Sequence, residues 1–430
     1  MQFFVDNLEV ISLIAFVIAV IITIWKDSNL GILAIGLAYI IGHLIGGVSV
    51  GDIIDGYPSR LLLILVGVTY FFGVAQTNGT LEKLTQYTIK SAKGNVAILP
   101  IVLFFLAVII SSIGPGQIAT SAMFAAPAMA LTIGTGINPL LMAIVVASGA
   151  QAGALSPLTP NGIIANTIMA DLGVVQDYSL TLWFHSLITF LISALIAYVL
   201  FGGLKLWKKS QVARSANEAL KNMKIEPFTM NQKLTLGAIA LLIFSVIILD
   251  MDVGFVAIGL GFLLTLFKIG DERAIFKVMP WGAIILVTGV TVLIRLMEDI
   301  GGIDLFADIM GRFSNPFTVT LVVGFIAAIV SAYASTSGVI MPAFMPMAPV
   351  LLGVIGAPAT ALVPLLFAIA IAGHLTDVSP LSTTGAVFIG GAPASIERRP
   401  LFNGMLIWGF GMSVFAAVIV WLFYSVFNLV

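Results

Sequence analysis

Two short segments of this 430-residue chain place prolines, hydroxyl side chains and a glycine inside long apolar runs. The first reads GALSPLTPNG at residues 153–162, and the second reads TDVSPLSTTG at residues 376–385. Proline removes a backbone donor and restricts the residue before it, so we expect each segment to break a helix. A broken helix offers free N–H groups at one end and free carbonyls at the other. These ends attract anions and cations respectively, so the expected chemistry is ion binding.

The composition indicates the surroundings of these segments. Hydrophobic residues make up 60% of the chain and charged residues 9%, whereas a soluble domain is roughly a quarter charged. Apolar runs of about 20 residues, the length that crosses a bilayer, recur along the sequence. We therefore expect an all-α polytopic membrane protein. The net charge of −1 argues against a nucleic-acid partner, and the absence of cysteine excludes disulfides and thiolate metal sites.

Asp377 is the acidic residue that we place deepest in an apolar segment, and His374 lies one helical turn before it. An ionisable side chain at membrane depth is costly and is typical of ion pathways. One interpretation makes Asp377 a cation ligand or proton carrier that His374 modulates. The other makes the two residues a buried hydrogen-bonded pair that only fixes the broken helix.

The basic residues predict a topology. Residues 205–233 are rich in Lys and Arg, so the positive-inside rule makes them a cytoplasmic loop. Both termini then lie outside, and we expect Arg295 to reach the outer surface or to pair with Glu298 or Asp299. The membrane is expected to be the inner membrane of a bacterial or archaeal cell. The predicted crossings cover residues 8–25, 29–48, 60–77, 138–171 and 179–202, then 234–249, 252–268, 280–297, 360–391 and 403–428.

Two further apolar stretches, 95–133 and 317–355, are too long for one crossing and too short for two full ones. Each has a polar centre, SSIGPGQ at 111–117 and SAYASTSG at 331–338. We interpret them as re-entrant hairpins, because non-helical backbone survives at that depth when it is buried in protein or lines a cavity. The alternative is a pair of short crossings joined by an ordinary loop.

The two halves of the chain resemble each other in sequence. Residues 67–84 align with 289–306, and residues 156–162 align with 379–385. Five crossings is an odd number, so the second half starts on the opposite side and the repeats should be inverted, as in secondary transporters. The predicted organisation is a first repeat at 1–204, a cytoplasmic linker at 205–233 and a second repeat at 234–430, each repeat having five crossings, one hairpin and one broken helix.

With two such repeats, the chain resembles the ion transporter superfamily, and within it the divalent anion:sodium symporter family and the bacterial malonate and dicarboxylate carriers. In that family each hairpin tip carries Ser-Asn-Thr. Here the second tip reads Ser335-Thr336-Ser337 and the first reads SSIGPGQ. The resemblance implies a homodimer, a cation site at each hairpin and helix break, and a substrate between the two tips.

The helix breaks and the resemblance together give a set of candidate residues. The substrate-binding candidates are Gly114, Gly116, Gln117, Thr159, Asn161, Ser335, Thr336, Ser337, Ser382, Thr383 and Thr384. The ion-binding candidates are Ser111, Ser112, Ser156, Thr376, Asp377 and Ser379.

The function expected from this set is alternating-access secondary transport of small organic anions, above all dicarboxylates, coupled to sodium or protons. The alternative is a cation/proton antiporter of the same superfamily, in which Asp377 carries the exchanged ion. An enzyme is not expected, because the sequence has no nucleophile–base pair or metal motif at recognisable spacing. The expected partners are the anion, sodium or a proton, the lipid bilayer and a second copy of the chain, with no cofactor beyond transported sodium.

Overall fold

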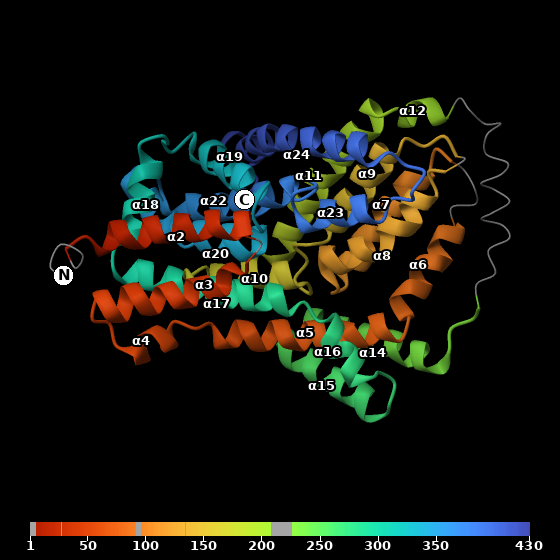
Figure 1. Cartoon of the computed structure of the whole chain (residues 1–430), viewed down its shortest axis with the longest axis horizontal. Helices are drawn as coiled ribbons and strands as arrows, with labels where there is room; N and C mark the ends of the chain where they lie inside the picture. The colour runs from red at the N-terminus through yellow and green to blue at the C-terminus, as the bar shows by residue number, and fades with distance from the viewer. Residues whose placement is uncertain (1–5, 27, 92–95, 134, 208–225) are drawn as a thin grey trace.

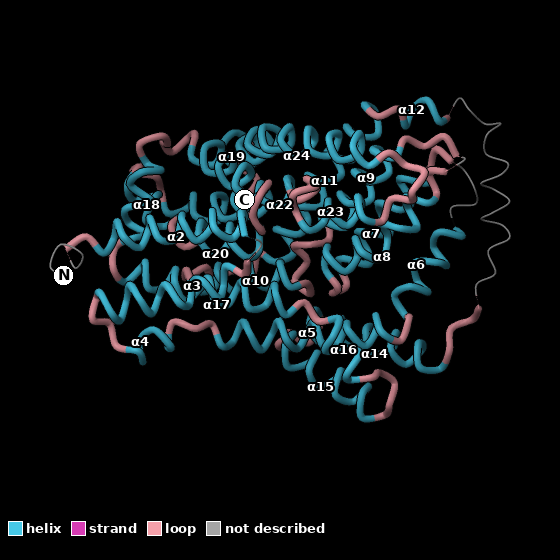
Figure 2. The backbone as a smooth tube through the Cα atoms, in the orientation of Figure 1, coloured by secondary structure: helices cyan, strands magenta, loops and turns pink. Residues whose placement is uncertain are grey.

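The computed structural model describes residues 6–26, 28–91, 96–133, 135–207 and 226–430 (Figure 1). All regular secondary structure in these ranges is helical, which confirms the all-α prediction (Figure 2). Most of the predicted cytoplasmic linker, residues 208–225, lies outside the described residues.

The first half is a series of mostly apolar helices. They are α2 (Leu8–Lys26), α3 (Leu30–Ala38) with the π-helical η1 (Tyr39–Ile45), α4 (Val50–Asp55), α5 (Ser59–Thr77), α6 (Thr80–Ser91), α7 (Leu99–Ser112), α8 (Gly116–Ala130), α9 (Pro139–Ala152), α10 (Pro160–Asp171), α11 (Ser179–Leu200) and α12 (Gly203–Leu206).

The second half repeats this order. Its elements are α14 (Met230–Ile247), α15 (Val253–Leu266), α16 (Glu272–Val278), α17 (Trp281–Asp299), α18 (Gly302–Gly311), α19 (Val319–Ser331), η2 (Thr336–Ile340), α20 (Met341–Phe344), α21 (Ala348–Val354), η3 (Ala359–Ala361), α22 (Leu362–Thr376), α23 (Thr383–Gly390), α24 (Arg398–Trp421) and η4 (Leu422–Val426). The starts of α5 and α17 are 222 positions apart, and so are those of α6 and α18. The inverted relation of the two halves stays a prediction.

Among the described residues, six helical stretches are long and apolar enough to cross a membrane, or seven if one bent pair counts as a span. Shorter apolar helices, among them α7, α9, α15 and α19, accompany them. Helices of this length and composition support an integral membrane protein. The predicted number of five crossings in each half stays a prediction.

The predicted broken helices are each two helices with an irregular segment between them. The first, α9 and α10, is interrupted at residues 153–159, and the second, α22 and α23, at residues 377–382. The first members lie in the centre of the protein, since residues 141–152 of α9 and 364–376 of α22 are all buried. In Figure 1, α7 and α8 lie toward the end of the molecule that carries α6 and α12, whereas α19 lies toward the opposite end with α18.

At two places a helix of the first half packs against a helix of the second half through a pair of glycines. A Cβ on Gly289 of α17 would lie 2.3 Å from the carbonyl oxygen of Gly31 on α3. A Cβ on Gly67 of α5 would lie 2.5 Å from the carbonyl oxygen of Gly254 on α15. Small residues allow helix backbones to approach this closely in a membrane. Gly254 follows Gly31 by 223 positions, and Gly289 follows Gly67 by 222, so the two glycine pairs are counterparts in the two halves.

Candidate functional site

The first helix break is closed by its own polar groups. Thr159 caps α10, because its hydroxyl oxygen accepts from the N–H of Gly162 at 3.2 Å. The same hydroxyl contacts the carbonyl oxygens of Ala154 and Ser156 at 2.5 and 2.8 Å. A Cβ on Gly162 would lie 1.9 Å from the Ser156 carbonyl oxygen, so the break requires glycine there.

The second break has the same construction. Ser382 caps α23 by accepting from the N–H of Gly385, and its hydroxyl contacts the carbonyl oxygens of Asp377 and Ser379. A Cβ on Gly385 would lie 2.1 Å from the Ser379 carbonyl oxygen. The two breaks are therefore one local structure, built twice at an offset of 223 residues.

Side chains at each break reach across to the other half. The amide Nε2 of Gln151, at the end of α9, donates to Thr384 Oγ1 at the start of α23, over 3.1 Å. Nε2 of His374, near the end of α22, lies 2.7 Å from the amide Nδ2 of Asn161 at the start of α10. His374 Nδ1 donates to the carbonyl oxygen of Ala370 at 2.7 Å, so Nε2 accepts from Asn161 and the ring is neutral. The sequence prediction paired His374 with Asp377, whereas the structure bonds it to Asn161.

Asp377 follows α22 directly and faces the tip of the second hairpin. Its Oδ1 lies 3.1 Å from the hydroxyl of Ser331, and its Oδ2 lies 2.9 Å from the hydroxyl of Thr336. The two hydroxyl oxygens lie 2.6 Å from each other. Ser331 and Thr336 are fully buried, and Asp377 is 7% exposed. The three side chains form one cluster, which we call the Asp377 cluster.

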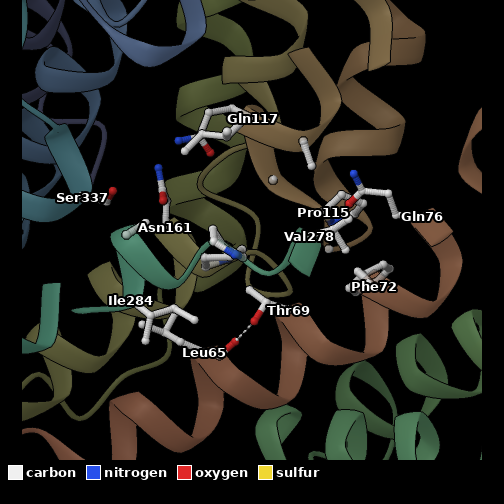
Figure 3. A pocket seen from close by; sticks show the side chains of 18 of the residues that line it. Leu65, Thr69, Phe72, Gln76, Pro115, Gln117, Asn161, Val278, Ile284 and Ser337 are labelled. Atoms are coloured by element: carbon white, nitrogen blue, oxygen red, sulfur yellow. Dashed lines mark hydrogen bonds between the residues drawn. The ribbon is translucent and has the colours of Figure 1, made fainter. Parts of the chain in front are cut away.

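A cavity of about 260 Å³ lies between the first hairpin tip and helices α5 and α17 (Figure 3). Polar groups on one side of this cavity, called the larger cavity below, come from Gln117, Asn161 and Ser337 (Figure 3). Leu65 and Ile284 belong to the opposite, largely apolar side, which α5 and α17 provide. The cavity thus offers amide and hydroxyl donors on the side of the hairpins and an apolar surface on the other.

A smaller cavity of about 100 Å³ adjoins the Asp377 cluster. Gln117 and Ile118 line both cavities, so the two spaces are neighbours. The remaining lining residues of the smaller cavity are Tyr333, Ala334, Ser335, Asp377, Leu381, Ser382, Thr383 and Thr384. Both hairpin tips and the start of α23 therefore meet around these two cavities.

The structure brings most of the substrate-binding candidates together. Gly114, Gly116, Gln117, Asn161 and Ser337 line the larger cavity. Gln117, Ser335, Ser382, Thr383 and Thr384 line the smaller one. Thr159 and Thr336 line neither, because the hydroxyl of Thr159 is used within its helix break and that of Thr336 within the Asp377 cluster.

Among the ion-binding candidates, Asp377 lines the smaller cavity, and the others except Ser111 make hydrogen bonds within the protein. Ser156 donates to the carbonyl oxygen of Ser112 at 2.7 Å, and Thr376 donates to that of Ala328 at 2.9 Å. Ser379 accepts from the N–H of Leu381. Ser112 accepts from Trp183 Nε1 at 3.1 Å, and the buried Ser111 hydroxyl has no hydrogen-bond partner among the described residues.

Sequence reasoning did not select Gln151, Ser331 or Tyr333 as site residues. The repeat offset was an available signal for Gln151, which lies 223 positions before His374, whereas Ser331 and Tyr333 both belong to the polar centre at 331–338.

Basic side chains, whether Lys, Arg or His, do not line either of the two cavities in the described part of the chain. Arg295 pairs with Glu298 at 3.2 Å, as the sequence suggested, and also with Asp171 at 3.1 Å. An anion in the cavities would have to be held by neutral donors and helix N-termini.

Residues 7–154 match the family model for the N-terminus of the dicarboxylate carrier protein MatC. No curated protein matches the chain. The matched residues extend from just before α2 to just after the end of α9, and they include the first hairpin tip that lines both cavities. This similarity supports a dicarboxylate transporter built into a membrane.

Proposed function

We propose that the protein is a secondary active transporter of small dicarboxylates, coupled to a cation by alternating access. The observation that carries the proposal is the match to the dicarboxylate carrier MatC over residues 7–154, which contain the tip that lines both cavities. A transporter of this kind needs a polar site at the centre of an apolar helical protein, and the two cavities supply one.

Neutral donors can hold the carboxylates. Helix α8 starts at Gly116 after Pro115, which offers no side-chain cap, so its first N–H groups are free to face an anion. Gln117, Asn161 and Ser337 add amide and hydroxyl groups on the same side of the larger cavity. A carboxylate accepts several such bonds, and charge-assisted bonds are stronger than neutral ones.

The two adjoining cavities suit a substrate with two charged ends. One carboxylate would lie in the larger cavity beside Gln117 and Asn161. The other would lie in the smaller cavity beside Ser335 and Thr383, whose side chains come from the second tip and from α23. Gln117 lines both spaces and would contact the middle of the substrate.

The membrane and a second copy of the chain are the proposed partners. Helices α14 and α15 expose large apolar side chains, including Leu241, Phe244, Phe255 and Phe262. Lipid tails would cover part of this surface and a second copy the rest, which would hold α14 and α15 still while the hairpins move. The proposed orientation places the 205–233 linker in the cytoplasm.

Uptake by proteoliposomes tests the proposal. Purified protein should accumulate labelled malonate or succinate when a proton or sodium gradient is imposed. Gln117→Leu should reduce uptake at least ten-fold, whereas Gln86→Leu on the surface helix α6 should not. If neither diacid is taken up under either gradient, the dicarboxylate assignment is wrong.

The buried Asp377 keeps a second candidate function open, namely cation/proton antiport. An antiporter moves protons in response to added sodium without any organic anion. A pH dye inside the proteoliposomes would report this exchange. Sodium-induced proton flux without malonate or succinate would favour the antiporter over the dicarboxylate carrier.

A further inference from the structure

The number of hydrogens that the Asp377 cluster needs indicates its protonation state. Three oxygen–oxygen contacts close a ring: Asp377 with Ser331, Ser331 with Thr336, and Thr336 with Asp377, at 3.1, 2.6 and 2.9 Å. The side-chain amide of Gln151 also approaches the carboxyl from outside this ring, and it adds no hydrogen to the three contacts. Each contact needs one hydrogen between its two oxygens. The two hydroxyl groups supply two hydrogens, so an ionised carboxylate would leave one contact with facing lone pairs.

A protonated carboxyl supplies the third hydrogen. Its O–H donates to one hydroxyl, that hydroxyl donates to the other, and the second hydroxyl donates to the remaining carboxyl oxygen. All three contacts are then satisfied, which matters because Ser331 and Thr336 are fully buried and an unsatisfied buried polar group is costly. A metal cation would need several oxygen ligands around it and would push this ring apart.

We propose that the cluster of Asp377, Ser331 and Thr336 is the proton-coupling site of the transporter, and that its three oxygen–oxygen contacts are those of the protonated form. This inference rests on the proposed transport function and names the coupling ion. Asp377 lines the smaller cavity, so the carboxyl that carries the proton lies beside the space assigned to one end of the substrate.

Two other titratable side chains, His374 and Tyr333, lie near the Asp377 cluster. His374, on the same helix, is held neutral between Ala370 and Asn161. Tyr333, from the second hairpin, is the other titratable side chain among the described residues that line the smaller cavity. Asp377 forms no ion pair among the described residues, so neither a Lys nor an Arg compensates its charge when it ionises.

The first half of the chain lacks a second site of this kind. The residue 223 positions before Asp377 is Ala154, and the counterpart of Ser331 is Ser111. Ser111 has a buried hydroxyl without a hydrogen-bond partner among the described residues. One proton-carrying carboxyl, rather than two, is therefore built into the pair of helix breaks.

The transfer itself is a simple acid–base step. On the loading side a hydronium ion gives its proton to a carboxylate oxygen of Asp377, an O–H bond forms, and the ring closes. On the release side this O–H bond breaks, and the proton passes to a water molecule that enters through the smaller cavity. The charge of the cluster alternates between −1 and 0.

Asp377→Asn is the discriminating variant, because its amide can donate to one hydroxyl and accept from the other but cannot release a proton. In proteoliposomes, accumulation of malonate driven by an acidic exterior without sodium should fall at least ten-fold. Exchange of labelled for unlabelled malonate, without any gradient, should fall less than the proton-driven accumulation does, because exchange needs no net proton release. Asp308→Asn, on the exposed face of α18, is the matched control and should retain both activities.

Infrared spectroscopy tests the site without relying on transport. Wild-type protein at neutral pH should show the carbonyl stretch of a protonated carboxyl, and Asp377→Asn should lack it. Absence of that band in the wild type, or full proton-driven accumulation by Asp377→Asn, would overturn the proposal. If the band is present but no diacid is transported, the dicarboxylate function fails while the protonated site stands.

Discussion

Gln151 donates its side-chain amide to Thr384 across the two halves of the chain, at 3.1 Å, and His374 and Asn161 make the corresponding contact in the opposite direction at 2.7 Å. Position 374 is 223 residues after 151, and position 384 is 223 after 161. The first helix of each broken pair, α9 or α22, is thus hydrogen-bonded to the second helix of the other pair, α23 or α10. The two substrate-binding candidates Asn161 and Thr384 are positioned by partners in the opposite repeat.

The hydrogen bond between Gln151 and Thr384 should be measurable as an interaction free energy in a double-mutant cycle. Gln151→Leu leaves the buried Thr384 hydroxyl without this donor, and we expect a loss of about 1 kcal/mol in unfolding free energy, as for buried polar pairs in membrane proteins. Thermal unfolding in detergent of Gln151→Leu, Thr384→Val and the double variant gives the interaction term. Strict additivity of the two single effects would show that the bond contributes nothing.

The glycines of the helix breaks should not tolerate a methyl group. In Gly162→Ala or Gly385→Ala the added Cβ would lie 1.9 or 2.1 Å from a backbone carbonyl oxygen, so the break must open. We expect each variant to lower the unfolding temperature strongly or to prevent recovery of folded protein. Gly237→Ala is the matched control, since nothing lies within 4 Å of its Cβ on α14, and alanine there should be neutral or mildly stabilising. Equal stability of all three variants would contradict the close approach at the breaks.

Substrate affinity should depend on Gln117 more than on Gln76, although both line the larger cavity. Gln117 also lines the smaller cavity and is proposed to contact the middle of the diacid. Losing one charge-assisted hydrogen bond costs roughly 1.5–3 kcal/mol, which is about one to two decades in affinity. Calorimetric titration of purified Gln117→Leu and Gln76→Leu with malonate checks this. Equal weakening in both variants would place the substrate elsewhere in the cavity.

The hydroxyl of Thr336 should matter for coupling and its methyl group should not. Thr336→Val removes one hydroxyl group of the Asp377 cluster, so proton-driven accumulation should fall several-fold. Thr336→Ser keeps the hydroxyl and should restore most of it. The measurement is malonate accumulation under an imposed pH gradient, with gradient-free exchange as the reference. A serine variant as impaired as the valine variant would indicate a packing role only.

The contacts of the hairpin tips predict a second conformation. A Cβ on Gly114 of the first tip would lie 1.7 Å from the ring of Phe72, and one on Gly338 of the second tip would lie 2.1 Å from Leu286. Leu286 corresponds to Ile64 at the repeat offset of 222. If the halves exchanged conformations, the first tip would contact α5 near Ile64, eight residues from Phe72 and about 12 Å along the helix.

Cysteine cross-linking can detect this movement, because the natural chain has no cysteine. A flexible bifunctional reagent should join Pro115→Cys to Phe72→Cys in the conformation described here. Pro115→Cys and Ile64→Cys should join when gradient and substrate populate the other conformation. A transport-competent protein in which the second pair never cross-links would exclude a displacement of this size.

The sequence by itself determined the helical class, the membrane setting and the positions of the two helix breaks. Those features follow from local chemistry. Pro157 and Pro160 remove backbone donors wherever the chain goes, Gly162 relieves a contact six residues away, and long apolar runs suit lipid in any arrangement. Most of the candidate residues suggested by the helix breaks and the resemblance line the two cavities, and their roles in binding stay predictions.

Only the tertiary structure decided how each hydroxyl is used. Thr159 and Thr383 look alike as candidate ligands in the sequence, yet Thr159 is fully buried in its own helix break and Thr383 lines a cavity. Gln151 and Thr384 are 233 residues apart in the chain, and Ser331 is 46 residues from Asp377. A hydroxyl bonds to the nearest suitable partner in space, and packing of distant helices brings that partner within reach, so side-chain type and spacing could not assign these bonds.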